Sequence, residues 1–201
     1  GIMGADPNKI RVSGENSFLR LGESEDADPT VEMSHWRVVA SCKGVGHILF
    51  AKSVLSDGKP RIYSDNIALA RWLQEGVQAS MRDTYSGDLH IIEAEFSKSG
   101  DMLTSWTERV VSREEEIVLV WYDFLPPVQV ANQPFENPDQ PHGVYSLLIP
   151  ARRAQLTING ETAPGRVLAR DLFGREGTSC CLALSETWTI PPDHEWAEDA
   201  L

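Results

Sequence analysis

Apolar and polar residues alternate along most of this chain, a pattern that predicts β-strands with one buried and one solvated face. In residues 35–43, for example, Trp36 and Val38 fall on the buried face, while His35 and Arg37 fall on the polar face. Turn-forming residues separate the alternating segments, as in Ser56-Asp57-Gly58, Ser99-Gly100-Asp101 and Asn159-Gly160. The spacing of these signals predicts about ten short strands.

A helical period occurs in one place, residues 65–82, where one apolar stripe contains Ala70, Leu73, Val77 and Met81. Ser64 or Asp65 can act as its N-cap, because both side chains carry an oxygen that accepts from free backbone N–H groups. A single amphipathic helix in a chain rich in strands most often covers a sheet, so we expect a packing role for it.

Three other regions of the chain contain turn or loop signals. Residues 8–13 and 17–22 predict a short hairpin around Gly14-Glu15-Asn16, and residues 22–33 predict an acidic, solvated loop. Residues 126–143 contain five prolines. A long connection of this kind is either a lid over a binding site or a passive surface loop, and the sequence leaves both open.

These elements predict an all-β fold, an antiparallel barrel or sandwich of about ten strands with one covering helix over residues 65–82. A length of 201 residues suits a single domain, with residues 1–7 and 191–201 expected to be peripheral. The outline is similar to that of lipocalin-type, calycin-like barrels. The Gly-x-Trp signature of their first strand is absent, so the sequence assigns no family.

The net charge of −12 disfavours nucleic acid and anionic membrane surfaces as partners, because both select clustered Lys and Arg. No apolar run is long enough for a signal peptide or a membrane span. Three cysteines, two of them adjacent at Cys180 and Cys181, do not form a disulfide framework, and they suggest a reducing cytoplasm. Gly44-Val45-Gly46 is a turn rather than a nucleotide-binding motif, so we expect no cofactor.

Tryptophan and a carboxylate occur two residues apart in three places: Trp106-Thr107-Glu108, Trp121-Tyr122-Asp123 and the reversed Glu186-Thr187-Trp188. Residues two apart on a strand share a face, so each carboxylate is expected beside an indole and facing inward. His90 falls on the apolar face of residues 90–96 in the same way. The sequence therefore predicts Glu108, Asp123, Glu186 and His90 on one interior face.

The pairing of the second and third strands of this region depends on the turn near residues 113–115. If Val111 faces Glu116, then Trp106 lies opposite Trp121 and Glu108 opposite Leu119. A turn two residues tighter makes Glu108 a diagonal neighbour of Asp123, roughly 7–8 Å away. Both alternatives keep the same faces, because the shift is even.

Buried carboxylates must be paired, protonated or hydrated. They can line a pocket with Trp106, Trp121 and Trp188 as walls, suited to a cationic or hydroxyl-bearing ligand. One of them can act as a general acid or base, with His90. They can also be structural, in ion pairs with Arg37, Arg71 or another arginine. No metal-binding spacing occurs, and His142, in the proline-rich segment, is a further candidate to close over a pocket.

From these residues we predict a protein that binds a small organic molecule inside a barrel. The predicted contacts are Trp106, Trp121, Trp188, Glu108, Asp123, Glu186, His90 and His142. Two alternatives remain open: an acid–base enzyme without a cofactor that uses the same carboxylates and His90, and an interaction protein that forms a homodimer through a sheet edge.

Overall fold

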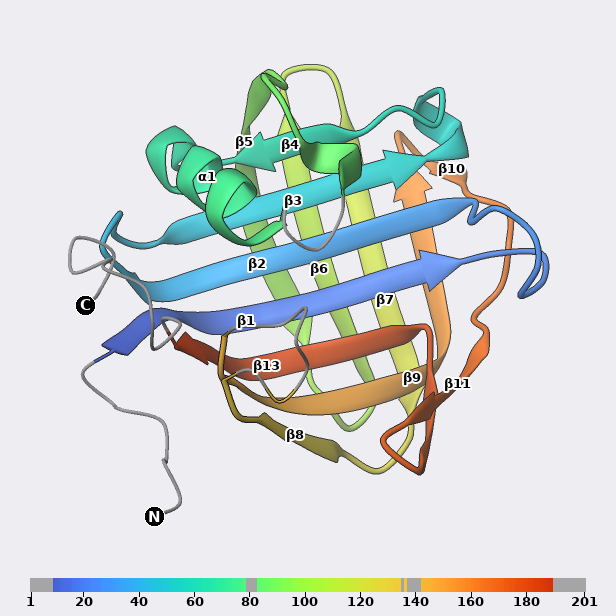
Figure 1. Ribbon diagram of the computed structural model, residues 1–201. Helices are drawn as coiled ribbons and strands as arrows, with labels where there is room; N and C mark the ends of the chain where they lie inside the picture. The colour runs from blue at the N-terminus through green and yellow to red at the C-terminus, as the bar shows by residue number, and fades with distance from the viewer. Residues whose placement is uncertain (1–8, 79–82, 135, 137–141, 190–201) are drawn as a thin grey trace, which may run out of the picture.

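Nine strands close into a barrel in the order β1, β2, β3, β4, β5, β6, β7, β9, β13 and back to β1 (Figure 1). The computed structural model describes residues 9–78, 83–134, 136 and 142–189. Its strands are β1 Ile10–Leu21, β2 Val31–Ser41, β3 Gly46–Ser53, β4 Arg61–Ser64, β5 Ile91–Gly100, β6 Ser105–Ser112, β7 Glu116–Phe124, β8 Val128–Asn132, β9 Val144–Ile158, β10 Glu161–Thr162, β11 Ala169–Leu172, β12 Arg175–Thr178 and β13 Cys180–Thr189. The predicted all-β barrel with one helix is confirmed. The expectations for residues 1–7 and 191–201 lie outside the described residues.

The odd number of strands requires a crossover connection, and the helix lies in that crossover. Strand directions cannot alternate all the way around a ring of nine, so at least one neighbouring pair must be parallel. That pair is β4 and β5, in which Ile62 pairs with Ile91 and Ser64 with Glu93. Parallel neighbours need a crossover rather than a tight turn. Residues 65–90 supply it, and they contain helix α1, Ile67–Leu73.

Helix α1 is shorter than predicted and begins at a different cap. The side chain of Asn66, rather than Ser64 or Asp65, accepts from the backbone N–H of Leu69. After Leu73 the helix widens into a π-helical turn, η3, Gln74–Gln78. The guanidinium of Arg11 packs against Gly76 and donates to its carbonyl oxygen at 3.0 Å, and a Cβ at Gly76 would overlap it. The predicted residues 79–82, with Met81, lie outside the described part.

Residues 10–21 form one continuous strand, so the predicted hairpin around Gly14-Glu15-Asn16 is wrong. Gly14 serves a close approach of two backbones, because a Cβ there would overlap the carbonyl oxygen of Arg37 on β2. The register between β1 and β2 shifts by one residue just before Gly14. A glycine inside a strand often marks such a bulge or a close backbone approach.

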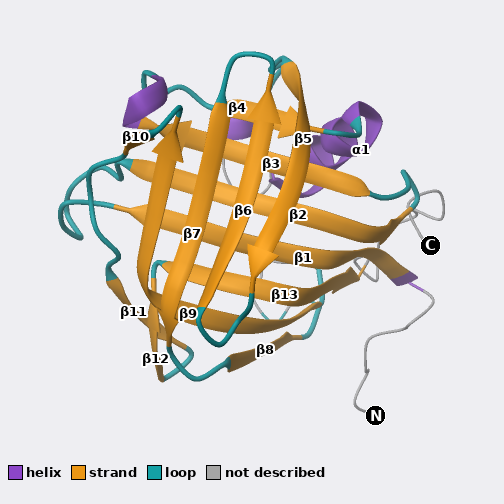
Figure 2. Ribbon diagram, turned by 180° about the vertical axis from the view of Figure 1, so that it is seen from behind, coloured by secondary structure: helices purple, strands orange, loops and turns teal. Residues whose placement is uncertain are grey.

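The barrel wall has a core on each side. The inner core fills the barrel and includes Leu19, Met33, Leu49, Leu119 and Trp121. The outer core lies between β2–β4 and α1, and it includes Trp36, Ile48, Phe50, Leu69 and Leu73. Seen from behind, β5, β6 and β7 cross over β1, β2 and β3, and the inner core lies between these two layers (Figure 2).

Strand β8 shows that the proline-rich segment is not a single loop. It continues the line of β7 after Pro126 and Pro127 and pairs with the first half of β9, while β7 pairs with the second half. Only the later part of residues 126–143 connects β8 to β9, and residues 135 and 137–141 lie outside the description. The turn at Asn159-Gly160 between β9 and β10 is confirmed, with φ values of 49° and 80°.

Each of the nine barrel strands has a neighbour on both sides, although β5 pairs with β4 only over residues 91–93. Among the described residues, no helix has the length and apolar character needed to cross a membrane.

Candidate functional site

Glu108 lies in the barrel interior, where it is only 2% exposed. Trp106 Nε1 donates to its Oε1 at 2.9 Å, as expected for a carboxylate two residues from an indole on one strand. Arg37 Nη2 donates to the same oxygen at 3.1 Å. Burial raises the pKa of Glu108, although the indole hydrogen bond and the charge of Arg37 lower it. Glu108 is thus paired with Arg37, as the structural alternative predicted.

Arg37 connects Glu108 to a wider interior polar cluster of Glu15, His35, Arg37, His47 and Glu108. Its Nη1 also donates to Glu15, and its Nε donates to His47 Nε2 at 3.2 Å. Because His47 Nε2 accepts, the ring proton lies on Nδ1, which donates to Asp65 Oδ2 at 2.6 Å. One guanidinium therefore joins two carboxylates and a histidine inside the barrel.

His35 is the most deeply buried member of the interior polar cluster. Burial, followed by the positive charge of Arg37, lowers the pKa of His35 to about 3, so the ring is neutral at physiological pH. Its Nε2 lies 3.5 Å from Glu108 Oε2. A proton on either of these two atoms makes the contact a hydrogen bond.

Sequence alternation assigned His35 and Arg37 to the polar, solvated face of their strand, and that assignment is wrong. They point into the barrel, while Trp36 and Val38 point outward into the core beneath α1. Both faces of β2 are buried here, so the alternation of residues in this strand does not reveal which face is inside. The sequence signal for this cluster was limited to naming Arg37 as an ion-pair partner.

Glu186 is also buried, at 6% exposure, but on the outer side of the barrel wall. A one-residue register shift between Ala183 and Glu186 in the pairing of β13 with β9 reverses the faces beyond it. Cys180 and Leu182 belong to the inner core, whereas Trp188 belongs to the outer core. The predicted common face of Glu186 and Glu108 is therefore wrong.

Three neutral groups donate to the Glu186 carboxylate. Trp188 Nε1 lies 2.6 Å and Asn16 Nδ2 3.0 Å from Oε1, and Ser146 Oγ lies 3.1 Å from Oε2. Burial raises the pKa of Glu186, and these three hydrogen bonds lower it. No Lys, Arg or His within the described ranges forms an ion pair with this carboxylate.

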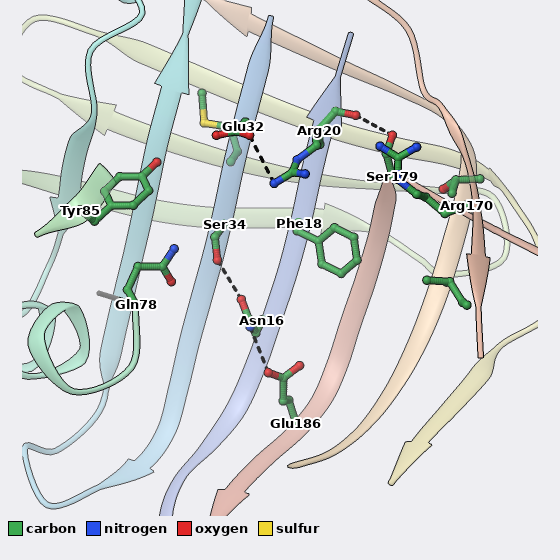
Figure 3. Close-up of a pocket in the computed structure, with 13 residues that line it drawn as sticks. Asn16, Phe18, Arg20, Glu32, Ser34, Gln78, Tyr85, Arg170, Ser179 and Glu186 are labelled. Atoms are coloured by element: carbon green, nitrogen blue, oxygen red, sulfur yellow. Dashed lines mark hydrogen bonds and ion pairs between the residues drawn. The ribbon is translucent and has the colours of Figure 1, made fainter. Parts of the chain in front are cut away.

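Glu186 lines a pocket of about 390 Å³ on the outer wall, which we call the wall pocket. Strands β1, β2 and β13 form its floor, and Figure 3 shows side chains from the crossover and from β11 on either side of it. Its apolar surface comes from Phe18, Tyr85 and Leu172, and its polar surface includes Asn16, Gln78 and Glu186. A second, more open hollow borders β4, β5 and β6 near Asp65 and Glu93.

Gln78 is a residue of the wall pocket that the sequence did not reveal. It ends the π-helical turn η3 and is only 2% exposed. Its Oε1 is buried and has no hydrogen-bond partner among the described residues. Its position in the predicted helix was the only available signal, and helical period alone does not predict a π-turn.

The other predicted contacts lie apart from both glutamates. Asp123 has a φ of 57°, its side chain is 44% exposed, and it forms surface ion pairs with Arg152 and Arg153. His90 is exposed just before β5. The prediction that these two residues share an interior face with Glu108 is wrong, because Asp123 departs from strand geometry and His90 precedes its strand.

The three predicted tryptophan walls also separate. Trp106 and Trp121 face each other inside the barrel, in the register where Val111 pairs with Glu116 and Glu108 with Leu119, so the wider of the two turns is present. Trp121 Nε1 donates across the barrel to the carbonyl of Phe18 at 3.0 Å rather than to Asp123. Trp188 instead packs outside the barrel against Trp36 and the buried His142.

Comparison with protein families, with curated proteins and with solved structures finds no match for this chain. Within the described residues, no three His, Cys, Asp or Glu side chains are grouped to hold a metal ion. The geometry of the wall pocket and of the interior polar cluster is thus the basis for any functional argument.

Proposed function

We propose that this barrel binds a small amphipathic organic molecule in the wall pocket, with Glu186 as its polar anchor. The observation that carries the proposal is a buried carboxylate without a cationic partner in the described chain, placed in the floor of a pocket. A volume of about 390 Å³ lies within the range of small-molecule sites. A buried carboxyl group with a raised pKa in a concavity is also a recognised mark of a functional site.

We therefore place the ligand in the wall pocket rather than in the barrel interior that the sequence predicted. The barrel interior is filled by the inner core, whose buried members include Leu19, Trp121 and Leu182. The wall pocket needs no rearrangement of this core. The acid–base alternative in its original form required Glu108, Asp123, Glu186 and His90 together, and their separation removes that arrangement.

The setting we propose is a reducing compartment such as the cytoplasm, with a small molecule as partner rather than nucleic acid or a membrane surface. All three cysteines are free thiols, and burial raises the pKa of Cys180 to about 12, which makes it a poor nucleophile. The net charge of −12 supports the exclusion of polyanionic partners.

A steric variant tests the location. Ser34 projects from β2 into the wall pocket, and Ser34→Phe should fill part of it. Thr107→Phe adds the same ring to a half-buried position on β6, away from the pocket, and serves as the matched control. A fragment library is screened by saturation-transfer NMR, and its hits are titrated by calorimetry.

Fragments that bind wild type and Thr107→Phe equally, and bind Ser34→Phe at least ten-fold more weakly, support the wall pocket. Fragments that bind all three proteins equally contradict this location. A library without any saturable binder contradicts the function. Melting temperatures of the three proteins should agree within a few degrees, which shows that lost binding does not reflect lost folding.

A further inference from the structure

Glu186 and Gln78 bring hydrogen-bond acceptors to the wall pocket. The Glu186 carboxylate receives three hydrogen bonds, all from neutral groups, and has capacity for a fourth because Oε2 accepts from a single described residue, Ser146. The buried Oε1 of Gln78 accepts from no described residue. Gln78 belongs to η3 and Glu186 to β13, so two separate elements bring acceptors to one pocket (Figure 3).

The charges around the pocket make Glu186 distinct. Two arginines line the pocket, but each contacts a carboxylate: Arg20 Nη2 lies 3.3 Å from Glu32, and Arg170 pairs with Glu25. The positive charges of Arg20 and Arg170 are therefore neutralised by these two carboxylates. Glu186 has no such partner within the described chain, so no described side chain supplies the counter-charge that an ionised Glu186 requires.

The apolar part of the pocket suits the remainder of a ligand. Phe18 projects from the centre of the floor, with Tyr85 at one side and Arg170 at the other, and Leu172 also lines the pocket. Aromatic rings next to a carboxylate favour a cation whose body is apolar, because ring faces attract positive charge and the body is removed from water. A primary or secondary ammonium group has three or two donors and no acceptor, which matches Glu186 and Gln78.

We propose that the wall pocket selects a small organic cation, a primary or secondary amine on an apolar or aromatic body, with its ammonium group against Glu186 and Gln78. This inference rests on the proposed function, because it names the ligand class of that pocket. It assigns Glu186 the role of counter-ion, Gln78 that of a second acceptor, and Phe18, Tyr85 and Leu172 that of the apolar walls.

Three probes of similar shape test the class: 2-phenylethylamine, 2-phenylethanol and 3-phenylpropionate. Their affinities are measured by calorimetry at pH 8 on wild type, Glu186→Gln and Glu108→Gln. Glu108→Gln is the matched control, since it neutralises the other buried glutamate that accepts from an indole, inside the barrel. We expect wild type and Glu108→Gln to bind the amine at least ten-fold more tightly than the alcohol, and the carboxylate most weakly.

In Glu186→Gln the amine should lose at least ten-fold in affinity, while the alcohol should change by less than about three-fold. Equal affinities of wild type for amine and alcohol overturn the ligand class but leave the wall pocket, which Ser34→Phe tests separately. If none of the probes and no library fragment binds, the proposed function fails as well. An amine preference that persists in Glu186→Gln assigns the selection to another group and overturns the role of Glu186.

The pH dependence of wild type provides a second measurement that needs no variant. An ammonium ligand requires ionised Glu186, so its affinity should rise between pH 5 and pH 8, while that of the alcohol should not. The other charged or titratable side chains at the pocket are Arg20, Glu32, Tyr85 and Arg170. An amine affinity that stays constant over this range overturns the proposal. Because this test uses wild type alone, it remains decisive if Glu186→Gln does not fold.

Discussion

Replacing His35 by Gln should remove a large part of the sensitivity of this protein to acid. The imidazole is fully buried and its pKa lies at about 3, whereas an unfolded chain protonates the same ring near 6.5. Below pH 6.5 the unfolded state therefore binds a proton that the folded state does not bind, and the free energy of unfolding falls. The loss is about 1.4 kcal/mol for each pH unit, so wild type should lose about 3 kcal/mol at pH 4 through His35.

The contribution of the neighbouring Glu108 carboxyl to the pH dependence of stability has the opposite sign. Glu108 has a raised pKa in the folded state, so its protonation favours folding as the pH falls. Each protein is therefore compared with itself at two pH values, which keeps the contribution of Glu108 in wild type and in His35→Gln. The control is His90→Gln, which removes an exposed histidine.

The assay is urea unfolding followed by tryptophan emission at pH 7 and pH 4. The free energy of unfolding should fall by about 3 kcal/mol more in wild type and His90→Gln than in His35→Gln. Side-chain NMR of wild type should show ring signals of His35 that do not shift between pH 7 and pH 5. A ring that titrates near pH 6.5, or equal losses in all three proteins, would refute the reasoning.

Three other perturbations follow from the wall and its register. Gly14→Ala should lower the free energy of unfolding by roughly 2–3 kcal/mol, since the new Cβ overlaps the carbonyl of Arg37 and one backbone must move; urea unfolding measures this. Asp123→Asn should cost less than about 1 kcal/mol in the same assay, because the ion pairs of Asp123 are exposed and Asn also tolerates the left-handed φ of this position. The melting temperature of Glu186→Gln should rise relative to that of wild type between pH 4 and pH 8. The raised pKa of Glu186 means that wild type is stabilised by a protonated carboxyl at low pH and loses this stabilisation as the carboxyl ionises. A difference in melting temperature that does not change with pH would contradict this.

Local pattern predicted much of the architecture because it follows from local geometry. Alternation located β2, β6, β7 and β13, and the Asn159-Gly160 turn has the positive φ values that its residue types favour. The opposition of Trp106 and Trp121 followed from counting residues through one turn. These features depend on neighbours a few residues apart, and the sequence contains that information.

The candidate site was harder because it depends on which side of the wall each residue faces. A single extra residue after Ala183 moved Glu186 from the inner to the outer face, and nothing in residues 180–189 announces a bulge. In β2 both faces are buried, so Arg37 and Trp36 exchanged their expected sides. Asp123 left its face through one left-handed backbone angle, which Asp tolerates better than most residues.

The pairing of β1 with β13 determines how this protein must be assembled. Leu19 and Cys180 are neighbours in that pair although most of the chain separates them. During synthesis, β1 and β2 emerge early, and the edge of β1 that pairs with β13 has no partner until β13 leaves the ribosome. Such an edge is a template for pairing with other chains. Closure across so long a loop also slows folding, so this topology keeps the edge of β1 exposed until the last strand is in place.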